Sequence, residues 1–399
     1  MSASQKVLVV DVAAGVWGAQ AYLLRLAEPM RRRGYELVLA APGGSELSAA
    51  WRGRNLPFVA ADLPASRSVR DGNGRLRATL MYREARALRR TVVEISRLAR
   101  HVGAVAMWGN GHAVHLDVAL ASRRAAVPGI VHLHEEMRPL FGRVLRSAAI
   151  VIAARTVAVS RAVRDGVPCR LRHRVETIPN GIDVAEFRPG EPDRGLRTAL
   201  GAGPDDVLIA AVTRIDPDKR IEDVIAALAP LGTRPGWHLV VVGSTSDYPS
   251  YENSVIDRAS GVLGSAVTFV GRRDDIPQVL RAADLLIHAG IREGMPLGVI
   301  EAQASGLPVV AYRVAGVPEA VVDRETALLA EPMNTGELTA HVRLLLDHPE
   351  MRESMSRLAV ERTRHVHSIE RQADRHADVL RGLLATPRLP VQPDRRRTA

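Results

Sequence analysis

The stretch from Arg292 to Tyr312, REGMPLGVIEAQASGLPVVAY, is the most informative part of this chain. Gly294 and the following proline mark a tight turn, and a short helix is predicted over about Pro296–Ser305, because proline suits the first helical position. The apolar run Pro308–Tyr312 that follows predicts a buried parallel strand. Strand and helix patterns alternate in this way over most of the chain, so the sequence predicts an α/β protein with two doubly wound parallel sheets.

Short apolar runs bounded by turn residues mark the strands, and apolar residues that recur every three or four positions mark the helices. The predicted strands are Val7–Val12, Glu36–Ala41, Pro57–Ala60, Gly103–Met107, Gly129–His134, Ile150–Ala153, Val157–Ser160, Val207–Thr213, His238–Gly243, Val267–Val270, Leu285–His288, Pro308–Tyr312 and Ala327–Ala330. The predicted helices include Ala19–Arg33, Leu76–Arg100 and Ser368–Leu384.

A proline- and glycine-containing stretch, Phe187–Arg194, is the predicted boundary between two domains. The first domain is expected over residues 1–188 and the second over residues 189–366. A helix over residues 367–385 follows them. The tail over residues 386–399 is rich in proline and arginine and is expected to be disordered.

Glu293 and Glu301 lie in the predicted turn and the predicted helix, eight positions apart. The start of that helix offers unpaired backbone N–H groups and a partial positive charge, which suit a phosphate. Glu301 leans back toward this helix end, where its carboxylate can accept hydrogen bonds from two adjacent ribose hydroxyls. Glu293 would face a sugar beyond the phosphates. Two lone glutamates are more often solvated charges, so the surrounding motif decides between these interpretations.

A second stretch, Val212–Glu222 (VTRIDPDKRIE), holds Arg214 at the end of a predicted strand and Lys219 close to the next helix. Two fixed cations at a strand–helix junction suit a diphosphate, and they can stabilise the charge that grows on a leaving phosphate. Surface salt bridges are the alternative. The chain has 52 arginines and only two lysines, and one of these two stands at this position, which favours a specific role for it.

The stretch from Glu293 to Ala311 closely resembles the Glu-x7-Glu motif of the retaining glycosyltransferases of family 4, E-G-x-P-x-x-x-x-E-A-x-A-x-G-x-P-V-V-A. Arg214 and Lys219 occupy the basic positions of the family's G-R-x-x-x-x-K-G motif, with Thr213 and Arg220 in place of its two glycines. The resemblance implies the GT-B fold, in which two Rossmann-like domains face each other across a cleft and a C-terminal helix crosses back to the first domain.

Further site residues follow from this resemblance, which covers about residues 6–370. His134 corresponds to a histidine near the donor sugar and the acceptor, although a structural histidine is the alternative. Trp17 replaces the first glycine of the family's N-terminal loop and would narrow the cleft or redirect the loop. The implied catalytic residues are Glu293, His134, Arg214 and Lys219. The implied donor-binding residues are Gly18, Arg214, Lys219, Gly271, Arg273, Ile276, Glu293, Gly294, Met295, Pro296, Leu297 and Glu301.

The implied reaction is transfer of a hexosyl or N-acetylhexosaminyl group from a nucleotide-diphosphate sugar, most readily UDP- or GDP-linked, to a hydroxyl group of a glycan, lipid or small-molecule acceptor. In the front-face mechanism of the family, the leaving phosphate accepts the proton of the attacking hydroxyl. The nucleotide sugar is a co-substrate, and neither a metal nor a further cofactor is expected. The alternatives are a natural-product glycosyltransferase, a pseudo-glycosyltransferase or epimerase on the same fold, and a non-catalytic nucleotide-sugar-binding protein in which Trp17 blocks the acceptor path.

Composition narrows these classes further. The chain has 399 residues, is 46% apolar and 25% charged, and is long enough for two domains with cores of their own. A membrane-spanning helix is not expected, because no apolar run reaches 18 residues. The first residues lack the layout of a signal peptide, and Cys169 is the only cysteine, so a cytoplasmic location is expected.

Charge divides the chain into unequal halves. Residues 1–190 hold 29 basic and 15 acidic residues, a net charge of +14, whereas residues 191–399 have a net charge of −4. Either genomic bias toward arginine or contact with an anionic membrane, lipid phosphate or glycan accounts for this excess. The basic segment Arg75–Arg100 is correspondingly either a solvated domain helix or an amphipathic helix on anionic lipid. Nucleic-acid binding is not expected, because aromatic residues make up 4% and no recognition motif is present.

Overall fold

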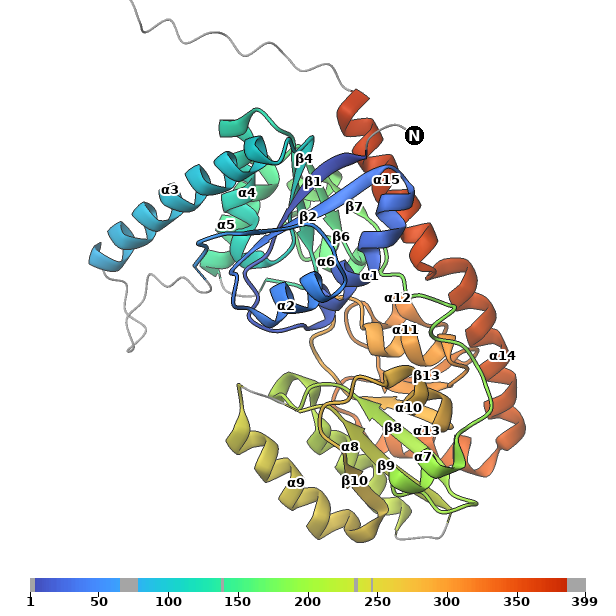
Figure 1. Cartoon of the computed structure of the whole chain (residues 1–399). Helices are drawn as coiled ribbons and strands as arrows, with labels where there is room; N and C mark the ends of the chain where they lie inside the picture. Colours follow the sequence, from blue (N-terminus) through green and yellow to red (C-terminus); the bar gives the residue numbers. More distant parts are fainter. Residues whose placement is uncertain (1–3, 65–77, 138–139, 233–235, 245–246, 386–399) are drawn as a thin grey trace, which may run out of the picture.

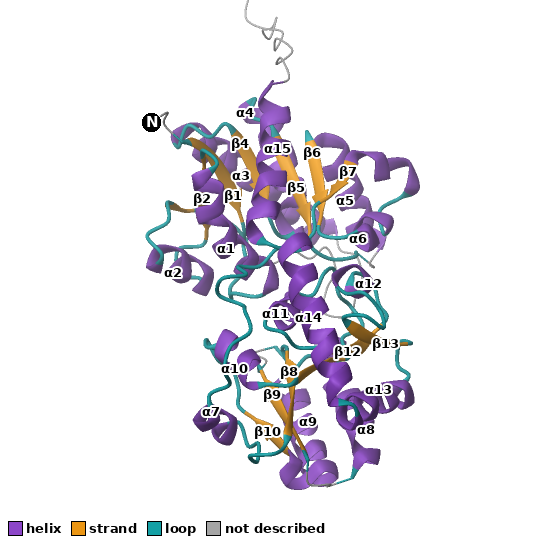
Figure 2. Cartoon of the chain, turned by 90° about the vertical axis from the view of Figure 1, so that its right-hand side faces the viewer, coloured by secondary structure: helices purple, strands orange, loops and turns teal. Residues whose placement is uncertain are grey.

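The computed structural model describes residues 4–64, 78–137, 140–232, 236–244 and 247–385. Within these residues the chain forms two parallel β-sheets, one of seven strands in the order β3-β2-β1-β4-β5-β6-β7 and one of six strands in the order β10-β9-β8-β11-β12-β13. Helices cover both faces of each sheet, and the two α/β units lie one above the other in Figures 1 and 2. This is the doubly wound arrangement that the alternating sequence pattern predicts.

The strands of the first sheet are β1 (Gln5–Val10), β2 (Tyr35–Ala41), β3 (Phe58–Ala60), β4 (Ala106–Gly109), β5 (Gly129–Leu133), β6 (Arg155–Ala158) and β7 (Val175–Thr177). Those of the second are β8 (Val207–Val212), β9 (Trp237–Val242), β10 (Val267–Phe269), β11 (Leu285–His288), β12 (Val309–Tyr312) and β13 (Ala327–Ala330). The α-helices are α1 (Gly18–Arg32), α2 (Glu46–Gly53), α3 (Ala78–His101), α4 (His115–Ala125), α5 (Leu140–Ile152), α6 (Arg161–Asp165), α7 (Arg194–Ala199), α8 (Ile221–Leu228), α9 (Pro249–Leu263), α10 (Ile276–Ala282), α11 (Leu297–Ala304), α12 (Val317–Ala320), α13 (Thr335–Asp347), α14 (Pro349–Val366) and α15 (Ile369–Ala385).

β1 is an interior strand of the first sheet, between β2 and β4, and its side chains are apolar on both faces. Successive side chains of a strand point to opposite faces. Val7 and Val9 therefore belong to a core with α1, α2 and α15, whereas Leu8 and Val10 belong to a core with α3 and α4. Burial on both faces explains why the strand reads as a continuous apolar run rather than an alternating one.

The last two helices run along one side of both sheets, as Figure 2 shows. α14 packs against α11 of the second unit, and α15 packs against α1 of the first. Arg33 at the end of α1 lies 2.8 Å from Glu370 and 2.7 Å from Asp374 of α15. The final helix therefore crosses back to the first unit as expected. The domain limits at residues 188 and 366 stay a prediction, and the predicted tail over residues 386–399 lies outside the described residues.

One predicted strand is wrong and one observed strand was missed. The predicted strand Ile150–Ala153 is the end of α5 together with the residue that follows it. Ala149 and Ile150 are buried while Val151 is exposed, which is the pattern of a helix with one buried face. A short apolar run does not distinguish a strand from a helix end. The missed strand β7 is a three-residue edge strand, VET, with too little apolar character to predict.

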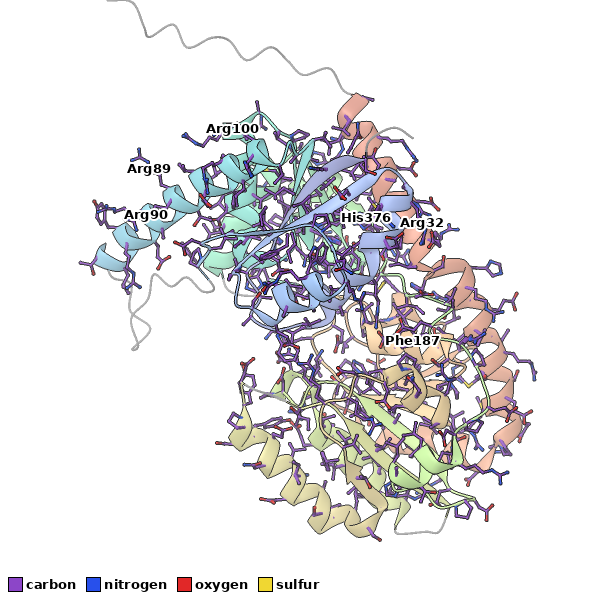
Figure 3. All side chains as sticks on the ribbon, viewed as in Figure 1. Arg32, Arg89, Arg90, Arg100, Phe187 and His376 are labelled. Atoms are coloured by element: carbon purple, nitrogen blue, oxygen red, sulfur yellow. The ribbon has the colours of Figure 1, made fainter. Side chains whose placement is uncertain are left out.

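The basic segment predicted near Leu76–Arg100 is the helix α3, whose described part begins at Ala78. Ile95 and Leu98 are buried against the first sheet and α4. Arg89, Arg90 and Arg100 extend outward from the helix (Figure 3) and are exposed. α3 is therefore a packed domain helix with an arginine-rich outer face.

The cleft between the units is formed where parallel strands of both sheets end. In the first sheet, Asp11 follows β1, Asn110 follows β4 and His134 follows β5. In the second sheet, Thr213 follows β8 and His288 ends β11. Loops after the carboxyl ends of parallel strands form the ligand crevice in open α/β sheets. The topology therefore brings these five side chains toward one cleft.

Candidate active site

Two adjoining hollows of about 700 and 710 Å³, lined by described residues of both units, lie in this cleft. We call them the Glu301 hollow, which is also lined by Arg273 and Ile276, and the Glu293 hollow, which is also lined by Lys219 and His134. Volumes of this size suit a small-molecule ligand or cofactor. Their shared lining consists of Ala14, Trp17, Gly18, Val212, Thr213, Arg214, Leu297 and Gly298.

Two helices begin at this shared wall. α1 begins at Gly18 and α11 at Leu297, and a Cβ atom added to Gly18 would lie 4.0 Å from Leu297 Cδ1. Pro296, the N-cap of α11, has no side-chain acceptor, so the N–H groups of the first turn remain available at the cleft. Two helix N-termini therefore direct positive partial charge at the same space, which favours an anionic ligand.

Gly294 brings the two units into direct backbone contact. A Cβ atom added there would lie 1.7 Å from the carbonyl oxygen of His134, far inside any allowed contact. Asn180, in the interdomain segment, donates from Nδ2 to the carbonyl oxygen of Met295 at 3.0 Å. The loop before α11 is therefore held against the first unit on two sides, and only glycine fits at position 294.

Glu293 is buried and paired rather than solvated. Its Oε1 atom lies 2.6 Å from Lys219 Nζ and 3.0 Å from His288 Nε2, and the residue is 8% exposed. Burial by itself would raise the pKa of Glu293, but Lys219 and His288 outweigh it and hold this pKa at about 2. The carboxylate is therefore ionised across the physiological pH range, with one oxygen fixed by two donors.

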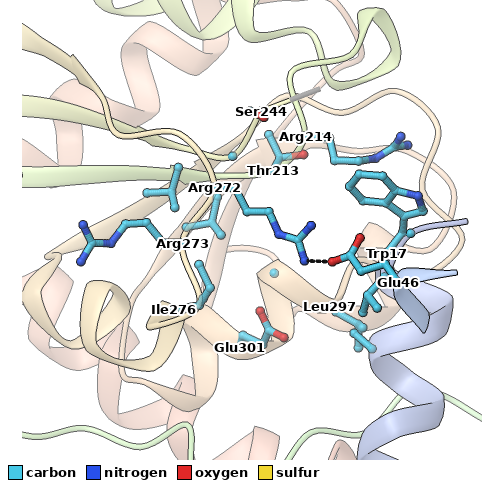
Figure 4. A pocket seen from close by; sticks show the side chains of 18 of the residues that line it. Trp17, Glu46, Thr213, Arg214, Ser244, Arg272, Arg273, Ile276, Leu297 and Glu301 are labelled. Carbon is cyan, nitrogen blue, oxygen red and sulfur yellow. Dashed lines mark hydrogen bonds and ion pairs between the residues drawn. The ribbon is translucent and has the colours of Figure 1, made fainter. Parts of the chain in front are cut away.

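Arg214 and Trp17 lie face to face at the junction of the hollows (Figure 4). The guanidinium carbon of Arg214 lies 4.9 Å from the Trp17 ring centroid, and Nη1 lies 2.7 Å from Asp216 Oδ2. A cation over an aromatic face is attracted to it and loses rotational freedom. The substituted glycine position thus carries a ring that holds one of the two predicted phosphate-binding cations in place.

Glu301 lies in the second turn of α11 and lines the hollow that bears its name. Its Oε1 atom accepts from Arg25 Nη1 of α1 at 2.5 Å, and the Arg25 guanidinium carbon lies 5.0 Å from the ring centroid of Phe187. Burial would lower the pKa of Arg25, but the ion pair with Glu301 outweighs it and raises this pKa. The pair orients the carboxylate from the opposite unit.

The far end of the Glu301 hollow is lined by Arg272, Arg273 and Ile276. Arg272 forms an ion pair with Glu46 of the first unit, drawn as a dashed line in Figure 4. Arg273 pairs with Asp275 at 2.6 Å. Gly271, predicted at the site, does not line either hollow; its carbonyl oxygen instead accepts from the N–H group of Gly243, a lining residue, at 2.8 Å.

His134 lies at the first-unit wall of the Glu293 hollow and is tied into a hydrogen-bond chain. Its Nε2 atom lies 2.9 Å from Asn110 Oδ1, and Asn110 Nδ2 donates to Asp11 Oδ2 at 2.7 Å. Gln20 Nε2 donates to the same Asp11 oxygen at 3.0 Å. Burial lowers the pKa of His134 to about 4, so the ring is neutral at pH 7. The accepting Asn110 oxygen requires the proton on Nε2, which leaves Nδ1 as an acceptor.

A buried cluster of aromatic rings lies behind His134. Tyr22 packs against His132, His134 and His376, and its hydroxyl lies 2.6 Å from His376 Nε2. Neither ring nitrogen of His132 has a hydrogen-bond partner among the described residues. Burial lowers the pKa of His132 far below its ordinary value and that of His376 to about 3. The cluster is therefore a neutral core that supports the strand end bearing His134.

This cluster makes stability depend on pH. Unfolded His376 takes up a proton below about pH 6.5, while the folded form stays neutral to about pH 3, so stability is lost as the pH falls through this window. Within this window, each such histidine lowers the free energy of unfolding by about 1.4 kcal/mol for each unit by which the pH falls. We expect urea unfolding at pH 7 and pH 5 to show a smaller difference for His376→Gln than for the wild type. The exposed His173→Gln variant is the control, and equal slopes in all three proteins would contradict the assignment.

The structure brings the predicted site residues, Gly271 apart, to one cleft. Gly18 and Arg214 line both hollows, Lys219, Glu293 and His134 line one, and Glu301 lines the other. Seven residues of the site were not predicted from the sequence: Arg25, His288, Asp11, Asn110, Glu46, Arg272 and Arg146, the last of which also lines the Glu293 hollow. A signal existed for Asp11 and Asn110, since each follows a parallel strand directly, as His134 does. Nothing in the sequence marks the partner of Glu301.

Among the described residues, no group of three or more histidine, cysteine, aspartate or glutamate side chains is placed to hold a metal ion. No helix of this part of the chain has the length and apolar character needed to cross a membrane. Independence from metal stays a prediction.

Two facing doubly wound units with a returning C-terminal helix and an interdomain cleft define the GT-B architecture. The Anabaena protein HepE, solved in complex with UDP and glucose, has this fold with a TM-score of 0.80 at 21% identity, over 95% of this chain and 100% of that chain. Sucrose-phosphate synthase from Thermosynechococcus elongatus matches with a TM-score of 0.77 at 20% identity, over 96% and 99%. At such identities the likeness establishes the fold alone.

The family profile described as glycosyl transferases group 1 matches residues 194–362, and that of glycosyltransferase family 4 matches residues 16–186. The two profiles together match both units, so the chain belongs to the glycosyltransferases of group 1 and family 4. It is 33% identical to a D-inositol 3-phosphate glycosyltransferase of Segniliparus rotundus over 191 residues, 47% of this chain and 42% of the relative. It is 34% identical to that of Mycobacterium marinum over 177 residues, 43% and 37%. The chain spans about two fifths of the length of these relatives.

Proposed function

We propose that this chain is a retaining glycosyltransferase that moves a hexosyl or N-acetylhexosaminyl group from a UDP- or GDP-linked sugar to an acceptor hydroxyl group. The arrangement of Arg214, Lys219 and the start of α11 around one cleft carries this proposal, because it collects cations and N–H donors where a diphosphate would lie. Structural neighbours solved with UDP and with UDP-glucose support a nucleotide-sugar donor.

The donor occupies both hollows in this proposal. Glu301, oriented by Arg25, accepts hydrogen bonds from the two ribose hydroxyls in the Glu301 hollow. The base lies farther along, between Ile276 and the backbone around Arg273. The diphosphate lies between Arg214 and Lys219 at the junction, and the sugar extends into the Glu293 hollow. Contacts with the wall of the Glu301 hollow select the base, and contacts with the wall of the Glu293 hollow select the sugar.

Transfer proceeds on the face of the leaving diphosphate. The acceptor hydroxyl attacks the anomeric carbon from the side that the phosphate leaves, and its proton passes to a phosphate oxygen, so the anomeric configuration is retained. Lys219 and Arg214 stabilise the negative charge that grows on the phosphate. Both donors to Glu293 act on Oε1, so Oε2 accepts from the donor sugar's 3- or 4-hydroxyl. His134 positions the sugar or the acceptor from the opposite wall. An inverted product, detected by proton NMR, would contradict this mechanism.

Binding of the donor is testable by thermal shift with UDP-, GDP-, dTDP- and ADP-sugars, because a ligand that binds the folded state raises its melting temperature. We expect Glu301→Gln to weaken nucleotide binding about tenfold, since the amide replaces charge-assisted hydrogen bonds to the ribose with neutral ones. Inorganic pyrophosphate should bind this variant as it binds the wild type. The exposed Glu325→Gln variant is the control. Equal loss of nucleotide and pyrophosphate binding would contradict the ribose assignment.

The acceptor class is a separate part of the proposal. Curated relatives are named for D-inositol 3-phosphate, which supports a small hydroxylated acceptor in the space beside His134 and Asp11. Glycans and lipids are the other candidates. A non-catalytic nucleotide-sugar-binding protein is the rival of another class, and it would bind donor while neither hydrolysing nor transferring the sugar.

We also propose peripheral contact with an anionic membrane through α5. This helix exposes Leu140, Phe141, Val144 and Val151, with Leu140 75% exposed, in a half of the chain with a net charge of +14. An apolar helix face bordered by arginines suits the interface of an anionic bilayer. The arginine-rich outer face of α3 adds positive charge to the same unit, because α3 packs on α4 and α4 packs on α5.

Vesicle flotation tests this contact. The combined Leu140→Ser, Phe141→Ser and Val144→Ser variant should lose about tenfold or more of its binding to vesicles that contain phosphatidylglycerol, because each apolar side chain contributes its burial in the interface. Val262→Ser on α9, which is similarly exposed, serves as the control. Undiminished flotation of the triple variant would remove α5 from the contact.

A further inference from the structure

Arg146 is a buried cation that the donor site leaves unused. It lies on α5, is 6% exposed and lines the Glu293 hollow from the first unit. Its Nη1 atom donates to the carbonyl oxygen of Glu135 at 2.8 Å, whereas Nε and Nη2 have no hydrogen-bond partner among the described residues. A buried charge with unfilled donors is costly, so proteins retain one where a ligand completes it.

The two acidic side chains near Arg146 do not form a buried ion pair with it. Burial lowers the pKa of Arg146, against the opposing effect of Glu135 and Glu136, and the guanidinium group still stays charged in proteins. Both glutamates are exposed, and Glu135 Oε1 lies 3.0 Å from His112 Nδ1. Arg146 therefore lines the hollow with two unfilled, buried guanidinium donors, and no buried carboxylate among the described residues receives them.

We propose that Arg146 binds an anionic group, a phosphate ester or a carboxylate, carried by the acceptor. This inference rests on the proposed function and adds the chemical class of its acceptor. Arg146 lines the hollow that also holds His134 and Glu293, where transfer would occur, and it does not line the Glu301 hollow assigned to the nucleoside. The planar guanidinium offers two parallel donors, Nε and Nη2, which match two oxygens of such an anion.

The arrangement separates two anion sites in one cleft. Arg214, Lys219 and the start of α11 belong to the second unit and serve the donor diphosphate. Arg146 belongs to the first unit and lies on the same wall as Asp11, His112 and His134. An acceptor held at its anion by Arg146 presents a hydroxyl group toward the second unit, where the donor sugar lies. Selection of charged over neutral acceptors follows from this geometry.

Calorimetric titration of inorganic phosphate and, separately, of glycerate tests the subsite, with UDP or GDP present at saturation so that the donor diphosphate site is filled. We expect at least one of the two anions to bind the wild type and to bind Arg146→Met about tenfold or more weakly. Arg146→Lys, which keeps the charge without the planar fork, should be intermediate. Arg143→Met, an exposed arginine three positions earlier on α5, should bind as the wild type does. Phosphate-only or glycerate-only binding identifies which anion the subsite takes.

Transfer assays give the second readout. Matched acceptors with and without a phosphate group, such as D-inositol 3-phosphate and inositol, should differ in KM in the wild type, and Arg146→Met should raise KM for the phosphorylated one with little change for the neutral one. The inference is overturned by absence of anion binding to the wild type, by equal binding to Arg146→Met, or by equal use of charged and neutral acceptors. Failure of every nucleotide to bind would instead overturn the proposed function. If Arg146→Met does not fold, anion titration of the wild type and of Arg146→Lys tests the subsite by itself.

Discussion

Replacing Lys219 with alanine is expected to reduce sugar transfer by about 10²–10³-fold, because this removes a preorganised cation from the leaving phosphate. It also strips Glu293 of the donor 2.6 Å from its Oε1 atom, so burial then raises the pKa of Glu293. Residual activity should therefore acquire an acid limb at a higher pH than in the wild type. Initial rates measured across pH, with UDP-induced melting shifts to monitor binding, check both effects.

The chain supplies its own control for this experiment. Lys6, the other lysine, is exposed near the start of β1 and has no assigned role in the site. Lys6→Ala should transfer sugar as the wild type does. Near-normal turnover by Lys219→Ala would show that the phosphate is not held where we place it. A matched Glu293→Gln variant separates the two roles, since it keeps Lys219 but removes the carboxylate charge.

Gly294→Ala is expected to reduce the rate of sugar transfer by about 100-fold or more without unfolding the chain. Its Cβ atom would meet the carbonyl oxygen of His134 at 1.7 Å, and backbone atoms cannot rotate away as a side chain does. The two units must then separate, and displacement of reacting groups by about 1 Å is enough to cost 10²-fold in rate. The second unit keeps its own fold, so nucleotide binding should persist in part while transfer is lost.

Gly261→Ala on α9 is the matched substitution, because a Cβ atom there meets nothing within 4 Å. It should be neutral or stabilise the helix by about 0.5–1 kcal/mol. Small-angle scattering should show Gly294→Ala more extended than Gly261→Ala. Normal transfer by Gly294→Ala would mean that the contact between Gly294 and His134 is not part of the reactive arrangement.

Much of the fold could be predicted from local sequence. The apolar runs of β1, β8, β11 and β12 are buried on both faces, so each reads as a strand without knowledge of its neighbours. α11 was predicted within a residue of its observed limits, because Pro296 marks where it begins. The wrong strand at Ile150–Ala153 and the missed β7 are short segments whose environment, rather than their residues, selects their structure.

The site was predictable only in part, for the same reason. Glu293, Glu301, Arg214 and Lys219 lie in local motifs whose spacing is visible along the chain. Arg25 is 276 positions from its partner Glu301, so no local pattern could reveal the pair. The same is true of Arg146, which has no motif and whose unfilled donors are apparent only once α5 is packed.

Local sequence was enough to predict most of the strands and helices and the residue types that gather at the ends of parallel strands, because periodicity and turn chemistry act over a few residues. The packing of the two units places Trp17 over Arg214, pairs Lys219 with Glu293, and leaves two donors of Arg146 without a partner among the described residues. These outcomes depend on distance, burial and the direction of side chains across two separately folded sheets. Such quantities arise when remote segments pack together, and the order of residues along the chain does not contain them explicitly.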